Sequence, residues 1–572
     1  MIKHMETQDV EALKQEELND GGSFRKGLTE TSRRKSMPGG WPGDICQGII
    51  MAYFLVITVI YPFYAPGGYV RIGEVKYVFF RNVSLVTLAV MAGMIVLSVA
   101  VRRDREWIIR NYRRMSVTDW FAYGYFIVVM LSYLCSAYKE DALWGVDGWY
   151  MGVITQMILI FLYFLFSRYF HCHIGWIGVW LLAAAGVFLL GICNRYSLYP
   201  ISMEGRTEIF ISTLGNINWF CGYWSVTAPI GITLYWCSDK IWIRILSALY
   251  SIIAMLSGLT QGSNSAYVVF MIMLLALFLA SLGNRTKTYR FLELGMIFAV
   301  SCCLGSLLWS LPELQYNYMP DREDIISYIT TALVTEDASL GLGMLVVVSG
   351  CSSVLQELEK YKIVQIGDYT KRHPRFKGIV TAAVVTTVCA AVIGLCTYIG
   401  ALHIDVALQA MKSDDGYKQV FEDDWGNGRG GAWNCGINAY RSMDTLHKIV
   451  GVGPDCFADY VYDVPELAER LASQFVNQRL TNAHNEQLTV LVNVGALGWL
   501  CYAGIFVSAF VRYMRRADRQ PLLYLCAVSI LSYTAHNMVS FQQVLNAPFV
   551  FIVLGIGERL YRGTAEGISY ES

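Results

Sequence analysis

A histidine at the edge of a long apolar segment is the residue best suited to acid–base chemistry. His484 lies in Asn482-Ala-His-Asn-Glu-Gln487, and the apolar stretch begins at residue 486. An imidazole exchanges a proton near neutral pH, and at this place it could meet water and a lipid-borne substrate together. Position alone leaves two roles open, a general base or a residue that caps the helix and anchors it at the membrane interface.

An arginine among glycines is the second candidate. Arg429 lies in Trp425-Gly-Asn-Gly-Arg-Gly-Gly-Ala-Trp433. The glycines would let a ligand approach the backbone closely, and a guanidinium places two donors on phosphate oxygens while it stays charged. The pattern indicates a phosphate-binding residue, and a surface arginine stacked on Trp433 is the alternative.

Two polar segments border other apolar stretches. Leu214-Gly-Asn-Ile-Asn-Trp-Phe-Cys-Gly222 carries Asn216 and Asn218, shortly after Arg206. Thr260-Gln-Gly-Ser-Asn-Ser-Ala266 carries Asn264. Such amides could bind a ligand, or they could cap helices while the glycines permit tight packing.

Metal and nucleotide chemistry have weaker signals. The pairs Asp414-Asp415 and Asp423-Asp424 could bind a divalent cation, but no His or Cys joins them at ligand spacing, which favours a solvated acidic face. The sequence has no P-loop and no dinucleotide fingerprint. We therefore expect no metal and no cofactor. Cys435 and Cys456 could form a disulfide or remain free thiols.

The elements that must position these residues are apolar helices. Of 572 residues, 55% are hydrophobic and 16% charged, and 45 basic residues balance 45 acidic ones, so no net charge attracts nucleic acid. Because a spanning helix needs ~20 mostly apolar residues, we expect an all-α, polytopic membrane protein of about 14 (12–14) transmembrane helices. The expected spans are 45–62, 84–101, 117–137, 151–170, 174–193, 217–237, 242–260, 264–282, 292–311, 329–351, 379–402, 486–511, 521–540 and 543–560.

The charges of the loops predict the orientation. If residues 1–44 are cytoplasmic, 31 of the 45 Lys and Arg residues fall in cytoplasmic segments, which is the positive-inside pattern. We expect a multi-pass protein of the cytoplasmic (inner) membrane with both termini cytoplasmic. Residues 1–44 are interpreted as a disordered tail without a signal peptide, and residues 563–572 as a second tail.

One loop differs from the others. Residues 403–485 are long, polar, rich in aromatic residues and external by the charge pattern. We expect helices at 433–449 and 464–480, with a turn at Gly451-Val-Gly-Pro454 that ends the first. The predicted organisation is a bundle of about 11 helices in 45–402, an extracytoplasmic helical cap in 403–485, and further spans in 486–562.

These motifs, in this order, resemble the O-antigen ligase and O-antigen polymerase family of bacterial membrane proteins. The resemblance covers roughly residues 45–560, and each motif is weak alone. The segments that carry it are Trp144-Gly-Val-Asp-Gly-Trp-Tyr-Met-Gly152, Leu214-Gly-Asn-Ile-Asn-Trp-Phe220, Gly428-Arg-Gly-Gly-Ala-Trp433, Gly451-Val-Gly-Pro-Asp-Cys-Phe457, Asn482-Ala-His-Asn-Glu-Gln-Leu488 and Gly495-Ala-Leu-Gly498.

The resemblance implies a glycosyltransferase. Family members move a glycan from a polyprenyl (undecaprenyl) diphosphate carrier to an acceptor hydroxyl on the external face of the membrane. It implies that His484 is the base, that Arg429 binds the donor diphosphate, and that the reaction is inverting and needs no metal. The expected supporting residues are Asn485 and Glu486, which would orient the histidine ring, and Asn216, Asn218 and Asn264.

The sequence departs from the family at one position. Asn264 stands where many members carry an arginine, and an amide cannot neutralise a diphosphate charge. Arg206 or Arg441 could take over that role.

Several functions remain open from the sequence. The acceptor could be lipid, cell wall, glycan or protein, which leaves a ligase and a repeat-unit polymerase as alternatives. A transporter or flippase and an inactive scaffold for cell-surface glycan assembly are the other readings.

Overall fold

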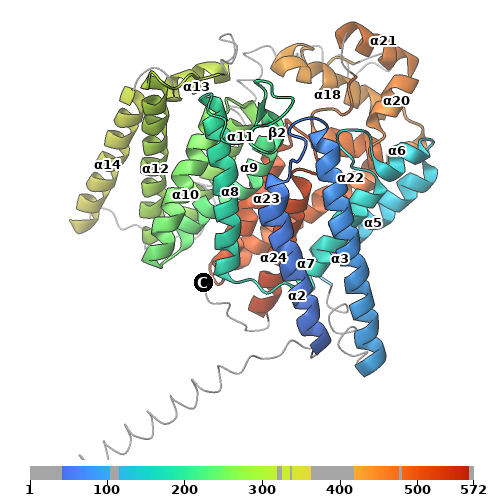
Figure 1. Cartoon of the computed structure of the whole chain (residues 1–572), viewed down its shortest axis with the longest axis horizontal. Helices are drawn as coiled ribbons and strands as arrows, with labels where there is room; N and C mark the ends of the chain where they lie inside the picture. The colour runs from blue at the N-terminus through green and yellow to red at the C-terminus, as the bar shows by residue number, and fades with distance from the viewer. Residues whose placement is uncertain are drawn as a thin grey trace, which may run out of the picture.

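The computed structural model describes residues 41–102, 115–317, 325–334, 338–361, 418–475 and 479–565. These residues form helices almost throughout, joined by short loops (Figure 1). The first half comprises α2 (Trp41–Leu55), continued by the π-helical η2 (Val56–Ile60) and the 3₁₀-helical η3 (Tyr61–Phe63), then α3 (Ile72–Arg102), α5 (Val117–Cys135), α6 (Lys139–Trp144), α7 (Val153–Tyr169), α8 (Ile174–Arg195), α9 (Ile217–Cys237), α10 (Ile241–Thr260), α11 (Asn264–Ser281), α12 (Arg285–Ser310), α13 (Ile325–Val334) and α14 (Ala338–Lys360).

The described part of the second half contains seven helices. They are α18 (Trp425–Ser442), α19 (Thr445–Val450), α20 (Phe457–Asp463), α21 (Pro465–Gln474), α22 (Glu486–Arg516), α23 (Leu522–His536) and α24 (Ala547–Ala565). One antiparallel pair of two-residue strands, β1 (Phe210–Ile211) and β2 (Gly215–Asn216), joins Phe210 to Asn216 and Ile211 to Gly215 before α9.

The helices fit a membrane protein. Within the described residues, nine helices are long and apolar enough to cross a bilayer. This confirms the all-α class and the presence of several apolar helices. The total of fourteen spans stays a prediction, and the expected span 379–402 and most of the tail 1–44 lie outside the described residues.

Some boundaries differ from the prediction. The first helix begins at Trp41 rather than at 45, because Pro42 is tolerated in a first turn, where its missing N–H is not needed. The expected span 329–351 is divided between α13 and α14, since the acidic pair Glu336-Asp337 interrupts the apolar run. The last helix continues to Ala565, into the expected tail.

The core of the bundle surrounds α9. Nearly every residue of this helix is buried, as expected for a helix that is apolar on all sides. Side chains from neighbouring helices donate to its carbonyl oxygens beside Pro229, including Ser529 to Val226 at 2.6 Å and Tyr250 to Thr227 at 3.0 Å. The helix that carries Asn216 and Asn218 is therefore firmly held.

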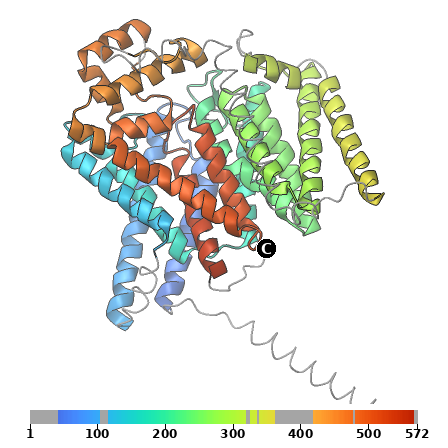
Figure 2. The ribbon, with the colours of Figure 1, turned by 180° about the vertical axis from the view of Figure 1, so that it is seen from behind.

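Four short helices form a cap at one end of the bundle. Figure 2 shows α18, α20 and α21 above the ends of α5 and α22. The expected helix 433–449 is broken in two, because Asp444 caps a new helix by accepting hydrogen bonds from the backbone N–H groups of Leu446 and His447. The cap has a hydrophobic core of its own, which includes Cys435, Met443, Val461, Leu467 and Leu471.

Candidate functional site

The cap is joined to the bundle through two glycine motifs. Gly451 ends α19 with a φ of 81°, as the predicted turn requires, and Gly495 breaks α22 with a φ of 69°. A Cβ on Gly451 would lie 2.2 Å from the Asn493 carbonyl oxygen, and one on Gly495 would lie 2.3 Å from the Ile449 carbonyl oxygen. The backbones touch, so both positions require glycine.

The loop between the cap and α22 fixes His484. The side chain of Asn485 caps α22 by accepting from the backbone N–H groups of Gln487 and Leu488. One residue earlier, the backbone N–H of His484 donates to Asn482 Oδ1 at 2.9 Å, and His484 has a left-handed φ of 47°. Such backbone strain in a non-glycine residue is often found at functional sites.

The imidazole of His484 is largely shielded from solvent and lies within the electrostatic influence of Arg429. Its ring packs edge-on against Phe541, with ring centroids 5.3 Å apart. Burial, and then the charge of Arg429, lower the pKa of His484 to about 4. The ring is therefore neutral at neutral pH and keeps a nitrogen lone pair free, although its proton affinity is below that of an ordinary imidazole. Arg429 binds the Val539 carbonyl, two residues from Phe541, so the two motifs approach the same short segment of the chain.

Arg429 is held in a fixed orientation at the start of α18. Its Nε donates to the Val539 carbonyl at 3.0 Å, and its Nη1 donates to the Gly426 carbonyl at 2.8 Å. Trp433 packs against Phe421 and Trp425, at ring-centroid distances of 5.0 and 5.4 Å. The arginine therefore bridges the cap and the loop after α23.

The glycines around Arg429 serve the packing of the cap. Gly426 and Gly428 have left-handed φ angles of 62° and 82°. A Cβ on Gly430 would lie 1.7 Å from the Glu422 carbonyl oxygen, and one on Gly431 would lie 1.8 Å from Gln474 Nε2. The sequence suggested close approach of a ligand, and the structure shows close approach of the protein's own chain.

The expected supporting residues of the histidine have other partners. Asn485 is engaged in the helix cap. Glu486 is buried and accepts hydrogen bonds from the hydroxyls of Tyr502 and Tyr533 and from the Asn537 side chain. These contacts fix α22 against α23, so both residues position the backbone that carries His484.

The remaining candidates do not all converge on the histidine. Asn216 caps α9 by accepting from the backbone N–H of Asn218 at 2.8 Å. Arg206 is exposed, with its guanidinium 3.8 Å from the ring centroid of Tyr199. Arg441 is exposed at the other end of α18, about 18 Å along the axis from Arg429. Asn264 is the first residue of α11.

A buried arginine that the sequence did not single out lies against the segment 260–266. Arg195, in the last turn of α8, is fully buried. Its Nε donates to Gln261 Oε1 at 2.9 Å, and its Nη1 donates to the Glu208 carbonyl at 3.0 Å. A positive charge therefore lies beside the segment 260–266, in which this chain has Asn264 where many members of the resembled family carry an arginine. In the sequence, an arginine that ends an apolar helix is the only signal.

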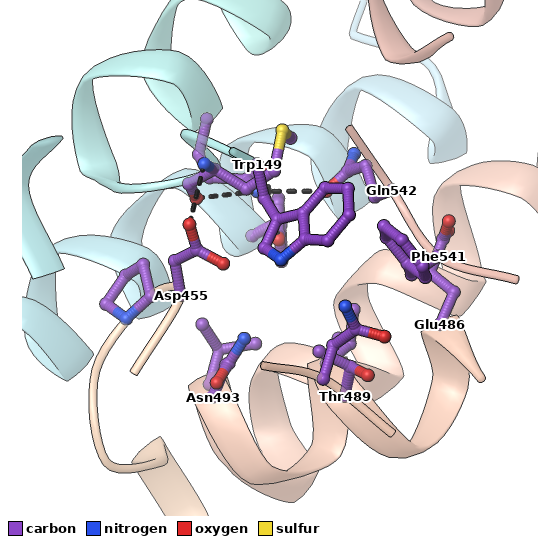
Figure 3. A pocket seen from close by; sticks show the side chains of 14 residues that line it. Trp149, Asp455, Glu486, Thr489, Asn493, Phe541 and Gln542 are labelled. Atoms are coloured by element: carbon purple, nitrogen blue, oxygen red, sulfur yellow. Dashed lines mark hydrogen bonds between the residues drawn. The ribbon is translucent and has the colours of Figure 1, made fainter. Parts of the chain in front are cut away.

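A small cavity adjoins the histidine, between the cap and the bundle (Figure 3). It is partly enclosed, with a free interior of about 30 Å³, room for about two water molecules. Asn482 and Phe541, which both contact His484, are part of its wall. The residues that line it are Tyr125, Trp149, Met151, Gln156, Pro454, Asp455, Asn482, Glu486, Thr489, Val490, Asn493, Val494, Phe541 and Gln542.

Metal ligands and disulfides were open questions from the sequence. Within the described ranges, no three His, Cys, Asp or Glu side chains come together as a metal site. Asp423 forms an ion pair with Arg470 at 2.7 Å, while Asp414-Asp415 lies outside those ranges. Cys435 and Cys456 are both buried free thiols.

The comparisons with known proteins add no relative. No family model matches the sequence, and no characterised protein aligns with it significantly.

Proposed function

We propose that the protein is a membrane glycosyltransferase that moves a glycan from a polyprenyl diphosphate carrier to an acceptor hydroxyl. The observation that carries the proposal is that His484 and Arg429, which come from different motifs, both contact the segment 539–541. A neutral imidazole beside a fixed guanidinium pairs a proton acceptor with a phosphate ligand. The resemblance of the surrounding motifs to O-antigen ligases and polymerases points the same way.

The reaction needs a base and a stabilised leaving group. His484 takes the proton from the acceptor hydroxyl as its oxygen attacks the anomeric carbon of the donor sugar. The bond from that carbon to the phosphate oxygen breaks, and polyprenyl diphosphate leaves with the electron pair. Arg429 stabilises the negative charge that grows on the diphosphate. Attack from the side opposite the leaving group inverts the anomeric carbon.

A lipid-borne donor suits the surroundings of the pair. His484 directly precedes α22, whose apolar residues fit a bilayer, and Arg429 lies in the cap. A diphosphate could therefore rest under the cap while its lipid tail lies between helices. We place the cap outside the cytoplasmic membrane, because the loop charges favour cytoplasmic termini.

The test is glycan transfer by purified protein in lipid nanodiscs. Wild type, His484→Ala and Arg429→Ala would receive a polyprenyl diphosphate oligosaccharide and a panel of lipid, peptide and glycan acceptors. The chain offers two matched controls, the half-buried His447 in the cap and the exposed Arg441 at the far end of the same helix as Arg429. Loss of transfer in the first pair, with His447→Ala and Arg441→Ala active, supports the proposal.

The products separate the remaining functions. A product that grows by repeats indicates a polymerase, and a single transfer to lipid, cell wall, glycan or protein indicates a ligase. Accumulation of the donor lipid's glycan inside sealed vesicles, without transfer to any acceptor, would indicate a transporter or flippase and would overturn the proposal.

A further inference from the structure

The cavity beside His484 contains polar groups that the proposed transfer step does not use. Figure 3 shows Asp455 on one side, Asn493 on the floor and Trp149 above the space. These side chains come from the cap turn, from α22 and from the loop between α6 and α7. They meet only in the folded protein.

Asp455 is held with one oxygen directed into this space. Its Oδ2 accepts hydrogen bonds from the backbone N–H groups of Val146 and Met151, both at 2.9 Å. The other oxygen points toward the space below Trp149 and has no hydrogen-bond partner among the described residues (Figure 3). Asp455 is only 8% exposed and has a left-handed φ of 63°. The second oxygen is therefore a buried hydrogen-bonding atom that a ligand in the cavity can reach.

Two side-chain amides near the cavity, those of Asn493 and Gln542, also have hydrogen-bonding groups without a protein partner among the described residues. Asn493 is 8% exposed, and its Oδ1 has no partner among the described residues, while its amide nitrogen points up into the cavity (Figure 3). Gln542 Oε1 accepts a hydrogen bond from Gln156 at 2.9 Å. Gln542 Nε2 is buried and has no hydrogen-bond partner among the described residues. The amide nitrogen of Asn493 is the one of these groups that faces the cavity, so it can donate a hydrogen bond to a polar ligand there.

The walls of the cavity are aromatic. Trp149 and Phe541 pack edge-on with ring centroids 4.5 Å apart, and Trp149 Nε1 donates to Thr481 Oγ1 at 2.7 Å, which fixes the indole. The free interior, about 30 Å³, holds about two water-sized groups. This is the size of a hydroxymethyl group, and a complete sugar ring would not enter.

We propose that this cavity receives the hydroxymethyl group of a hexopyranose unit of the glycan. Its hydroxyl donates to Asp455 and accepts from the amide of Asn493, while the ring stays outside against the rims of Trp149 and Phe541. The inference rests on the proposed function for its substrate class, since it names the sugar feature that the site selects. Asp455 and Asn493 are then specificity residues, and hexoses are favoured over pentoses and 6-deoxyhexoses.

The experiment measures binding without transfer. Saturation-transfer difference NMR on the full-length protein in nanodiscs would compare methyl glucoside and methyl galactoside with methyl xyloside and methyl 6-deoxyglucoside. We expect the first two to bind about tenfold more tightly than the last two, since a site built around a hydroxyl rejects analogues that lack it. Equal binding of all four, or binding of none, would overturn the proposal and would show that the cavity holds only water.

Two substitutions separate ligand binding from folding. Asn493→Leu should keep the Tm, because the polar atom that it removes is unpaired, and should abolish the preference for the hydroxymethyl group. The control Asn438→Leu removes an amide bonded to Lys418 and Asn434, so it should lower the Tm and leave the preference unchanged. Asp455→Asn keeps an oxygen for the two backbone N–H groups and should also lose the preference. A preference that survives in both Asn493→Leu and Asp455→Asn would contradict the assignment.

One further part of the experiment tells whether the sugar at the cavity belongs to the acceptor or to the donor. Methyl glucoside that becomes glycosylated places an acceptor sugar at the cavity, and methyl glucoside that competes with the polyprenyl diphosphate oligosaccharide places a donor sugar there. If the protein shows the binding preference but transfers no glycan, the cavity assignment stands and the proposed transfer reaction fails.

Discussion

Two polar regions lie at opposite ends of the helices, and they are built on different principles. One is the site of His484, Arg429 and the Asp455 cavity at the cap end. The other is an ion cluster at the far end of the bundle, formed by Asp119, Arg168, Arg512, Glu558 and Arg562 where α5, α7, α22 and α24 meet.

In the far-end cluster each carboxylate is shared by two arginines. Asp119 is fully buried and pairs with Arg168 at 3.0 Å and with Arg562. Glu558 is also fully buried and pairs with Arg512 at 2.6 Å and with Arg562 at 3.0 Å. The cluster connects four helices, and each of its carboxylates is paired with arginines. Its role is therefore to hold these helices together.

At the cap end the polar atoms are left unpaired and the backbone is strained. Asn493 Oδ1 and Gln542 Nε2 have no partner in the described part of the chain, and Asp455 and His484 both have left-handed φ angles. Each far-end carboxylate is paired with two arginines, whereas Asp455 at the cap end has no arginine or lysine partner among the described residues and directs one oxygen into the cavity. The difference separates a region that holds the helices from one that we propose handles substrate.

The largest expected effect is the loss of catalysis at the cap end. We expect His484→Ala to reduce glycan transfer roughly 10²–10⁴-fold, because a general base contributes about that much. The Tm should fall only slightly, since within the described residues the structure shows one ring contact of His484, with Phe541, and no ion pair. The measurement is the rate of transfer in nanodiscs with a saturating donor. Retention of more than half of the wild-type rate would remove His484 from the mechanism.

The opposite pattern is expected at the far end. Asp119→Asn should destabilise the protein by about 3–5 kcal/mol, because it leaves the buried Arg168 without its counter-charge and takes one of two carboxylates from Arg562. The transfer rate per folded molecule should stay close to wild type. Thermal unfolding in detergent measures the first quantity, with Asp518→Asn as the control, since that carboxylate is 82% exposed and its ion pair with Lys287 adds little. Asp119→Asn protein that is stable but inactive would reverse the comparison.

The sequence predicts the helices well because the apolar runs leave few alternatives. Caps and breaks were also readable, as the turn at Gly451 shows. A helix break that depends on a single polar residue is harder to predict. Asp444 caps a new helix inside the segment 433–449, which the sequence predicts as one helix.

The sequence named His484 and Arg429 but could not assemble the site around them. The cavity takes residues from the cap, α22 and two loops. Phe541 carries no local pattern that marks it, and Asp455 lies in the motif 451–457 but was not singled out as a candidate. Arg195 was missed for the same reason, because its contact with Gln261 joins α8 to the segment after α10. Spacing along the chain predicts neighbours on one helix, whereas contacts between helices depend on packing.

A smaller effect on donor binding should distinguish the hydrogen-bond donors of the Arg429 guanidinium from its positive charge. Arg429→Lys keeps the charge but loses the planar donors, one of which binds the Val539 carbonyl. We expect the KM for the polyprenyl diphosphate donor to rise about 10–100-fold, in line with the value of one or two charge-assisted hydrogen bonds. Arg441→Lys, on the same helix, should leave the KM unchanged. An equal loss in both variants would indicate a general effect of charge on the cap.

The smallest expected effect lies in the pH dependence of transfer. The pKa of His484 is lowered to about 4 by burial and by Arg429, so in the free enzyme the base stays deprotonated as the pH falls from 7.5 to 6. A histidine with an ordinary pKa of about 6.5 would lose roughly fourfold in kcat/KM over that range. We expect almost no loss in the wild type. Arg429→Gln removes the neighbouring charge and should raise the pKa of His484, which would move the acid limb to higher pH. An NMR titration of the His484 ring in both proteins measures the same shift without catalysis, and identical titration curves would show that Arg429 and His484 act as separate groups.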